Sequence, residues 1–173
     1  ETEFIVADES INGEMALDGN YYIESGRSGS RNKNPNKYLN DAKLLERGYE
    51  EEKSRDLGLA SRYCYYIAQS YRDCPNTKEY QDLSIEWYKK RIQMGGWSQE
   101  TYVSCIGLGN QLLKQDKFKE AVKAFSDSIK VDPERMEGVI KLVEIFTHDQ
   151  MYSLVNALYF KFKNYKYPKE KLF

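Results

Sequence analysis

The sequence predicts an all-α protein built from helical hairpins, preceded by a short segment of different character. Three observations support this. From residue 35 onward apolar residues recur every three or four positions, which is the spacing of one helix face. Glycines and prolines interrupt the periodicity and leave room only for short loops. Part of the pattern recurs at steps of about 34 residues, as stacked helical units do.

Residues 1–34 lack this periodicity. Two strand-like runs, residues 4–6 (Phe-Ile-Val) and 21–23 (Tyr-Tyr-Ile), lie among Asn-Gly and Gly-Asn turn signals. The segment is too short to form a core alone. We expect it to be the last strands of a sheet domain or a tether, and we expect the helical domain to occupy residues 35–173.

The first expected helix spans residues 35–52. Asn34 is its predicted N-cap, and Pro35 takes the first position, where a missing N–H is tolerated. Its apolar stripe places Tyr38, Ala42 and Tyr49 inward. The other expected helices span residues 59–72, 79–94, 99–114, 117–131, 134–147 and 150–162.

Local signals mark where these later helices begin and end. Ser98 is the expected cap of the fourth helix and Asp116 that of the fifth. The pair Gly95-Gly96 stops the third helix, and the pair at 132–133 (Asp-Pro) stops the fifth. On the last helix the periodicity places Tyr159 inward.

The helices pair into repeats. The best unit starts at Tyr102 and puts small residues, Gly109 and Ala121, where two antiparallel helices must approach closely, with Phe125 filling the gap toward the next unit. These offsets are those of the tetratricopeptide (TPR) repeat, and weaker copies lie on either side. We therefore predict TPR-like antiparallel helix-hairpin repeats, an α-α superhelix with a concave groove.

Four positions of the first repeat are predicted to line that groove: Arg62, Tyr65, Gln69 and Arg72. The second repeat adds Val103 and Asn110. Two guanidiniums with an aromatic ring and an amide on one face can hold a carboxylate or phosphate. The alternative is that the arginines are solvated and pair with Asp73 or Glu79.

Composition and residue types exclude several kinds of function. A net charge of -1 argues against a dedicated nucleic-acid binder, and no apolar run approaches the length of a membrane span. One histidine, His148, and no cysteine pair at ligand spacing give no metal site. We expect no catalytic residue and no cofactor in this chain, and we expect His148 on the surface.

The three cysteines favour a structural reading. Cys64 and Cys105 occupy the same inward offset of two repeats, which predicts core packing, whereas Cys74 lies between helices and is expected to be an exposed thiol. An odd, sparse count fits reduced thiols in the cytoplasm better than a disulfide framework.

Residues 26–31 (Gly-Arg-Ser-Gly-Ser-Arg) form a polar loop between the two segments. Its flexible backbone, with Arg27, Ser28 and Arg31, could wrap an anion with N–H groups and charge. The alternative is a polar linker without a ligand.

The order of several motifs resembles one known family. The succession resembles the C-terminal part of bacterial-type and large-virus family-2 glycosyltransferases that carry TPR-like repeats behind the catalytic domain. The likeness covers roughly residues 19 to 115. The motifs are residues 19–23 (Gly-Asn-Tyr-Tyr-Ile), 26–31, 34–41 (Asn-Pro-Asn-Lys-Tyr-Leu-Asn-Asp), 62–73 (from Arg-Tyr-Cys to Tyr-Arg-Asp), 85–91 (Ile-Glu-Trp-Tyr-Lys-Lys-Arg) and 94–97 (Met-Gly-Gly-Trp).

The resemblance implies a division of labour. In that family a GT-A type domain binds a nucleotide sugar, usually with a divalent metal, and such a domain would lie before Glu1. This chain would then be a non-catalytic module that positions an acceptor or a partner, with Arg27 and Arg31 at the domain junction. The alternative is a free-standing TPR adaptor that binds a peptide or protein in its groove.

Overall fold

A computed structural model describes residues 33–164, and every regular helix or strand in this range is an α-helix, which confirms the all-α prediction there. The chain divides into residues 1–33 and 34–173, and only the second, helical unit is described here. The strands expected within residues 1–34 fall outside the described residues. The helices are α1 (Lys37–Glu52), α2 (Leu57–Asp73), α3 (Lys78–Met94), α4 (Ser98–Leu113), α5 (Phe118–Val131), α6 (Glu137–His148) and α7 (Tyr152–Phe162).

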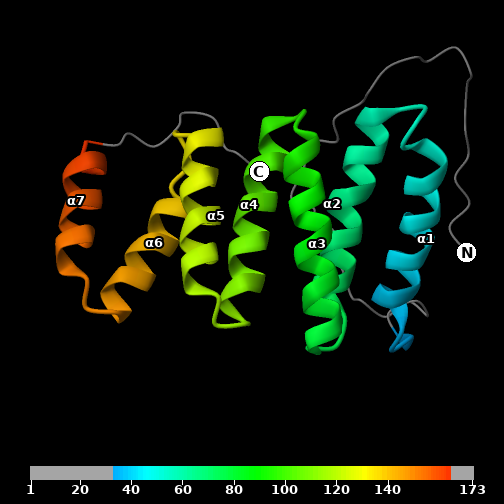
Figure 1. The fold of residues 1–173 in the computed structure, drawn as a ribbon, viewed down its shortest axis with the longest axis horizontal. Helices are drawn as coiled ribbons and strands as arrows, with labels where there is room; N and C mark the ends of the chain where they lie inside the picture. Colours follow the sequence, from blue (N-terminus) through cyan, green and yellow to red (C-terminus); the bar gives the residue numbers. More distant parts are fainter. Residues whose placement is uncertain (1–32, 165–173) are drawn as a thin grey trace, which may run out of the picture. The chain divides into compact units, whose positions relative to one another are not determined.

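The helices of this unit lie side by side in chain order and run alternately in opposite directions (Figure 1). Each packs on the helix before it, and α2 also contacts α4. Contacts between consecutive helices, with an added contact between first helices of adjacent hairpins, are typical of stacked helical hairpins.

Each expected helix start differs from the observed one by one to three residues, and the three predicted caps were wrong. Asn34 does not cap α1: its Oδ1 accepts a hydrogen bond from the backbone N–H of Asn36 at 2.9 Å, and the helix begins at Lys37. Ser98 is the first helical residue rather than the cap. Asp116 has a φ of 57° and belongs to the turn before α5. Asn34 and Asp116 are used in tight turns, whereas Ser98 lies inside the helix because α4 begins one residue earlier than expected.

Other residues perform the capping. The Asp56 side chain accepts a hydrogen bond from the Leu59 N–H at 2.9 Å at the start of α2, and Thr77 accepts one from Tyr80 at the start of α3. The predicted stop after α3 is confirmed. Gly95 and Gly96 have φ values of 67° and 88°, which residues with a Cβ rarely adopt.

The core consists of two clusters. One joins α1 to α2 around Ala42, Tyr49, Cys64 and Ile67. The other extends from α2 to α6. Its main buried members are Ala68, Tyr88, Leu108, Leu112, Ala121, Phe125, Leu142 and Ile145.

Glycines permit the closest helix contacts. A Cβ on Gly109 would lie 2.5 Å from the Phe125 ring, and one on Gly107 would lie 2.5 Å from the Tyr88 ring. The predicted close approach at Gly109 is therefore confirmed, with Phe125 packed against α4 of its own hairpin. Because α4 has a glycine opposite an aromatic ring on each neighbouring helix, it can lie tightly between α3 and α5.

Three side chains differ from their predicted exposure. Tyr38 and Tyr159 are 39% and 62% exposed, not inward, because each lies on a terminal helix that has a neighbour on one side only. Cys74 is 7% exposed, not an exposed thiol, because the residue at the end of α2 still packs in the α1–α2 cluster.

Candidate functional site

The strongest candidate site is a hollow of about 420 Å³ between α2 and α4, which we call the Arg62 pocket. It has α2 on one side and the start of α4 on the other, with one side chain from the α5–α6 connection. The residues that line it are Arg62, Tyr65, Tyr66, Trp97, Gln99, Glu100, Val103 and Arg135.

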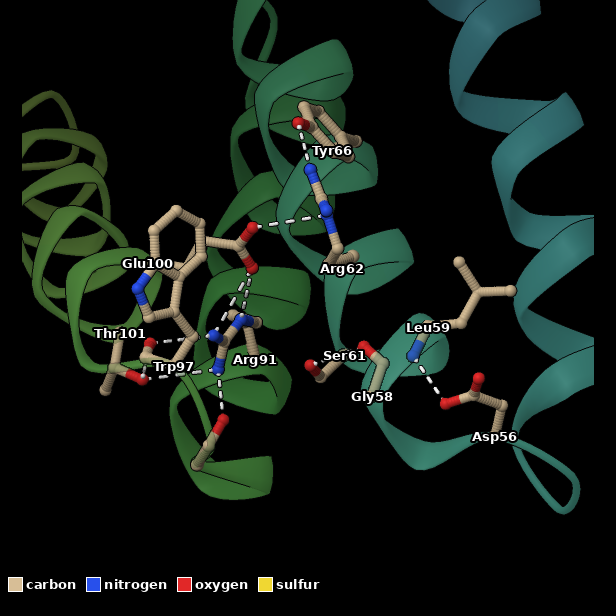
Figure 2. A network of polar contacts seen from close by, with 11 residues as sticks. Asp56, Gly58, Leu59, Ser61, Arg62, Tyr66, Arg91, Trp97, Glu100 and Thr101 are labelled. Carbon is tan, nitrogen blue, oxygen red and sulfur yellow. Dashed lines mark hydrogen bonds and ion pairs between the residues drawn. The ribbon is translucent and has the colours of Figure 1, made fainter. Parts of the chain in front are cut away.

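Glu100, which lines this pocket, forms a buried ion pair with Arg91. Arg91 is fully buried, and its guanidinium lies 3.3 Å from Oε2 of Glu100, which is 5% exposed (Figure 2). Arg91 also donates to Thr101 Oγ1 and to the carbonyls of Gly95 and Trp97. A buried guanidinium needs such a set of acceptors, so this network fixes the turn between α3 and α4.

The second oxygen of the same carboxylate faces the pocket. Nε of Arg62 lies 3.5 Å from Oε1 of Glu100, and the Arg62 side chain is 56% exposed. It also donates to the Tyr66 hydroxyl at 3.3 Å (Figure 2). The hydrogen bond to Tyr66 and the Glu100 carboxylate raise the pKa of Arg62 above its usual value, so Arg62 is charged at all working pH values.

Arg135 closes the opposite wall and is held by its neighbours. It donates to Gln99 Oε1 at 2.7 Å and to Glu137, and it lies 4.2 Å from the centre of the Tyr102 ring. Burial raises the pKa of the Glu137 carboxyl, but hydrogen bonds from Arg135 and Tyr102 outweigh it and leave that pKa below its usual value. This wall is therefore held by several side-chain contacts and contains the counter-charge of its own guanidinium.

Aromatic rings supply most of the remaining surface. Tyr65 is half-buried and meets Tyr66 edge to face at 5.3 Å between ring centres. Trp97 is 54% exposed at the start of α4. An exposed indole that lines the same pocket as a charged guanidinium offers an apolar face and a cation to one bound group.

The structure brings together some of the predicted groove residues but not all. Arg62, Tyr65 and Val103 line the pocket, whereas Gln69 is half-buried on α2 and does not line it. Arg72 does not line it; it pairs with Asp73 at 2.8 Å, which was the alternative prediction for this residue.

The remaining predicted site residues lie elsewhere. Asn110 is half-buried on α4 and does not line the Arg62 pocket. The loop residues Arg27, Ser28 and Arg31 lie outside the described residues.

Sequence reasoning missed Trp97, Glu100 and Arg135 as pocket residues. One signal pointed to the network beneath them: Arg91 occupies an inward position of its repeat, where a charge needs a partner. An acid nine residues further on, across the Gly-Gly turn, was that partner.

The three thiols are buried, and the single histidine lies on the surface. Burial raises the pKa of Cys64 and of Cys105 to about 11, and it also raises the pKa of Cys74. Thiols that stay protonated are poor nucleophiles. His148 is exposed at the end of α6 beside Asp149, as predicted. Within residues 33–164, no cluster of His, Cys, Asp and Glu could hold a metal ion.

A second hollow lies at the last hairpin. It measures about 360 Å³ between α6 and α7, and Ile140, Leu158 and Phe162 are among its mainly apolar lining residues. We call it the α6–α7 groove. It has few polar groups that could orient a ligand.

Comparisons with protein-family models, with curated proteins and with solved structures returned no match for this chain. Among the described helices, none has the length and apolar character needed to cross a membrane.

Proposed function

We propose that this chain is a non-catalytic binding module of TPR-like helical hairpins, and that the Arg62 pocket holds its partner. One observation supports this most: the pocket combines an exposed cation, exposed aromatic rings and a wall whose guanidinium, that of Arg135, already has hydrogen-bond partners. Arg62 and Trp97 are both more than half exposed, while Arg91 is bonded to the Gly95 and Trp97 carbonyls and Arg135 to the Gln99 and Glu137 side chains. Preorganised sites of this kind bind with little ordering of their own side chains.

The thiols and the pocket carboxylate are in environments that favour binding over catalysis. The thiols are buried and protonated. The pocket's carboxylate, Glu100, has both oxygens in contact with guanidiniums, which leaves it poorly suited to accept a proton from a substrate.

The family resemblance extends the proposal. Motif order in residues 19–115 supports a glycosyltransferase-like parent protein, in which this module positions an acceptor or a partner beside a sugar-transfer domain outside these residues. The nucleotide sugar and the divalent metal would then belong to that domain. The free-standing adaptor remains the second candidate, and the pocket itself fits either.

Nuclear magnetic resonance titration of the full chain with defined ligands tests the proposal. The panel contains short peptides, neutral and acidic oligosaccharides, and nucleotide sugars. We expect at least one member to shift the amide signals of Arg62, Tyr65 and Val103, and we expect the substitution Arg62→Glu to weaken its binding.

Two results would contradict the proposal. One is a panel in which no member shifts those signals, or in which Arg62→Glu leaves every ligand bound. The other is turnover of a nucleotide sugar by this chain alone.

A further inference from the structure

The charges around the Arg62 pocket are unequally shared. On the Arg62 side two guanidiniums, those of Arg62 and Arg91, face one carboxylate, that of Glu100. Arg91 is fully buried and contacts Oε2 with two nitrogens, at 3.3 and 3.4 Å. Because a buried cation depends most on its counter-ion, the Glu100 charge is mainly committed to Arg91.

Arg62 therefore keeps an uncompensated positive charge. It contacts Glu100 only at 3.5 Å, and its guanidinium retains donors that face the solvent. The opposite wall has no such excess, since Glu137 contacts Arg135 and Asp132 is hydrogen-bonded to Gln99 beside it. An anionic group is attracted to the Arg62 side of the pocket and not to the Arg135 side.

Most of the other polar groups of the pocket already have partners. Gln99 accepts from Arg135 through Oε1 and donates to Asp132 through Nε2. Both oxygens of Glu100 are in ion pairs, and the Tyr66 hydroxyl accepts a hydrogen bond from Arg62. A sugar ring, which carries several hydroxyl groups, would find few partners here. The groups that remain available are the Arg62 guanidinium and the exposed Trp97 ring. A ligand with an anionic group next to an apolar group matches them.

We infer that the Arg62 pocket binds a short acidic peptide segment, in which an Asp or Glu carboxylate pairs with Arg62 and an adjacent aromatic or aliphatic side chain packs on Trp97. This inference rests on the proposed function. The carboxylate takes the free guanidinium donors in a charge-assisted pair. The apolar neighbour covers Trp97, which is 54% exposed, and contacts Val103 deeper in the pocket.

Fluorescence polarisation on the full chain tests the inference with defined peptides. The probes are labelled octapeptides of glycine and serine that carry Asp-Phe, Asn-Phe or Lys-Phe at the centre. We expect the Asp-Phe peptide to bind about tenfold or more tightly than the Asn-Phe peptide, and we expect no binding of Lys-Phe. Its affinity falls as salt rises.

Matched variants separate the pocket from general electrostatics. Arg62→Gln removes the charge, Arg62→Lys keeps it, and Trp97→Ala removes the apolar face. Arg55→Gln makes the same change of charge at an exposed arginine that pairs with Glu52 outside the pocket. We expect about tenfold weaker binding for Arg62→Gln and for Trp97→Ala, a smaller loss for Arg62→Lys and none for Arg55→Gln.

Three results would overturn the inference. The first is equal binding of the Asp-Phe and Asn-Phe peptides, and the second is an equal loss in Arg62→Gln and Arg55→Gln. The third is binding of hexamers of glucose or galacturonic acid at the pocket when no peptide binds. In that third case the proposed function would stand and only the peptide inference would fail. The proposed function and the inference would both fail if no ligand of any class shifted the NMR signals of the pocket residues.

Discussion

The guanidinium of Arg91 lies 3.3 Å from the carboxylate of Glu100, and both side chains are buried where α3 turns into α4. The pair therefore has two roles. It closes the turn between two hairpins, and by drawing the Glu100 charge inward it leaves Arg62 available at the surface.

Removing one member of this buried pair should destabilise the fold strongly. We expect Arg91→Met to lower the free energy of unfolding by about 3 to 5 kcal/mol, because Glu100 would remain buried beside a single, exposed cation. Urea denaturation measures the loss. The double variant Arg91→Met/Glu100→Leu should lose less than the sum of the two single variants. A loss below about 1 kcal/mol in Arg91→Met, comparable to that of an exposed ion pair, would contradict the account.

A methyl group on α4 should disrupt its contact with α5. Alanine forms helices better than glycine, yet we expect Gly109→Ala to be destabilising by about 1 to 3 kcal/mol, because its Cβ would lie 2.5 Å from the Phe125 ring. Thermal unfolding measures it. Combining Gly109→Ala with Phe125→Leu should relieve part of the clash, so the two effects should not add. A stabilised Gly109→Ala variant would show that the helices are not in close contact there.

The buried thiols predict a loss of stability in alkali. In the unfolded chain cysteine ionises near pH 8.5, whereas burial raises the pKa of Cys64 and Cys105 to about 11 in the folded chain. The folded state then holds protons that the unfolded state has lost. Their contribution is complete below about pH 8.5 and falls as the pH rises toward 11, by about 1.4 kcal/mol per pH unit for each thiol.

Urea unfolding at pH 8, 9 and 10 checks this dependence. The control is the Cys64→Ala/Cys105→Ala variant, which is less stable throughout because it loses core volume, but whose stability should change less between pH 8 and 10. An equal slope in both proteins would mean that the thiols are not buried as described.

Arg135 should couple α4 to the last hairpin. It bonds to Gln99 and Glu137 and lies over the Tyr102 ring, while the Tyr102 hydroxyl reaches Glu137 at 3.0 Å. We expect Arg135→Ala to increase amide hydrogen exchange in α6 and α7 and to leave α2 and α3 unchanged. Arg55→Ala, at an exposed site, serves as the control. Uniformly faster exchange in all helices would argue against a local coupling.

Periodicity predicted the helices well because α1 to α6 each have residues that are buried against a neighbour. Ala42, Ile67, Phe125 and Leu142 lie in the core as their spacing requires. The caps were harder to predict. Asn34 and Asp116 have the right chemistry, but each is used in a turn whose backbone geometry no residue pattern specifies.

The candidate site was predicted only in part, for a physical reason. Helix spacing placed Arg62 and Tyr65 on one face, which the pocket confirms. The opposite wall depends on how the next hairpins lie, and this brings Arg135, which is 73 positions away from Arg62 in the chain (135 minus 62), to the same hollow. Arg62 and Arg91 share the Glu100 carboxylate, and burial decides which guanidinium remains available to a ligand. Burial depends on tertiary packing, which residue spacing does not specify.

The two tryptophan indole signals in a nitrogen-edited NMR spectrum give the most direct test of the central claim. Trp97 lines the Arg62 pocket, whereas Trp87 packs against Tyr49 with ring centres 5.2 Å apart and serves as an internal reference. On titration with the Asp-Phe octapeptide the account predicts a saturable shift of the Trp97 indole signal and an unmoved Trp87 signal. Shifts confined to Trp87, or to amides of the α6–α7 groove, would contradict it.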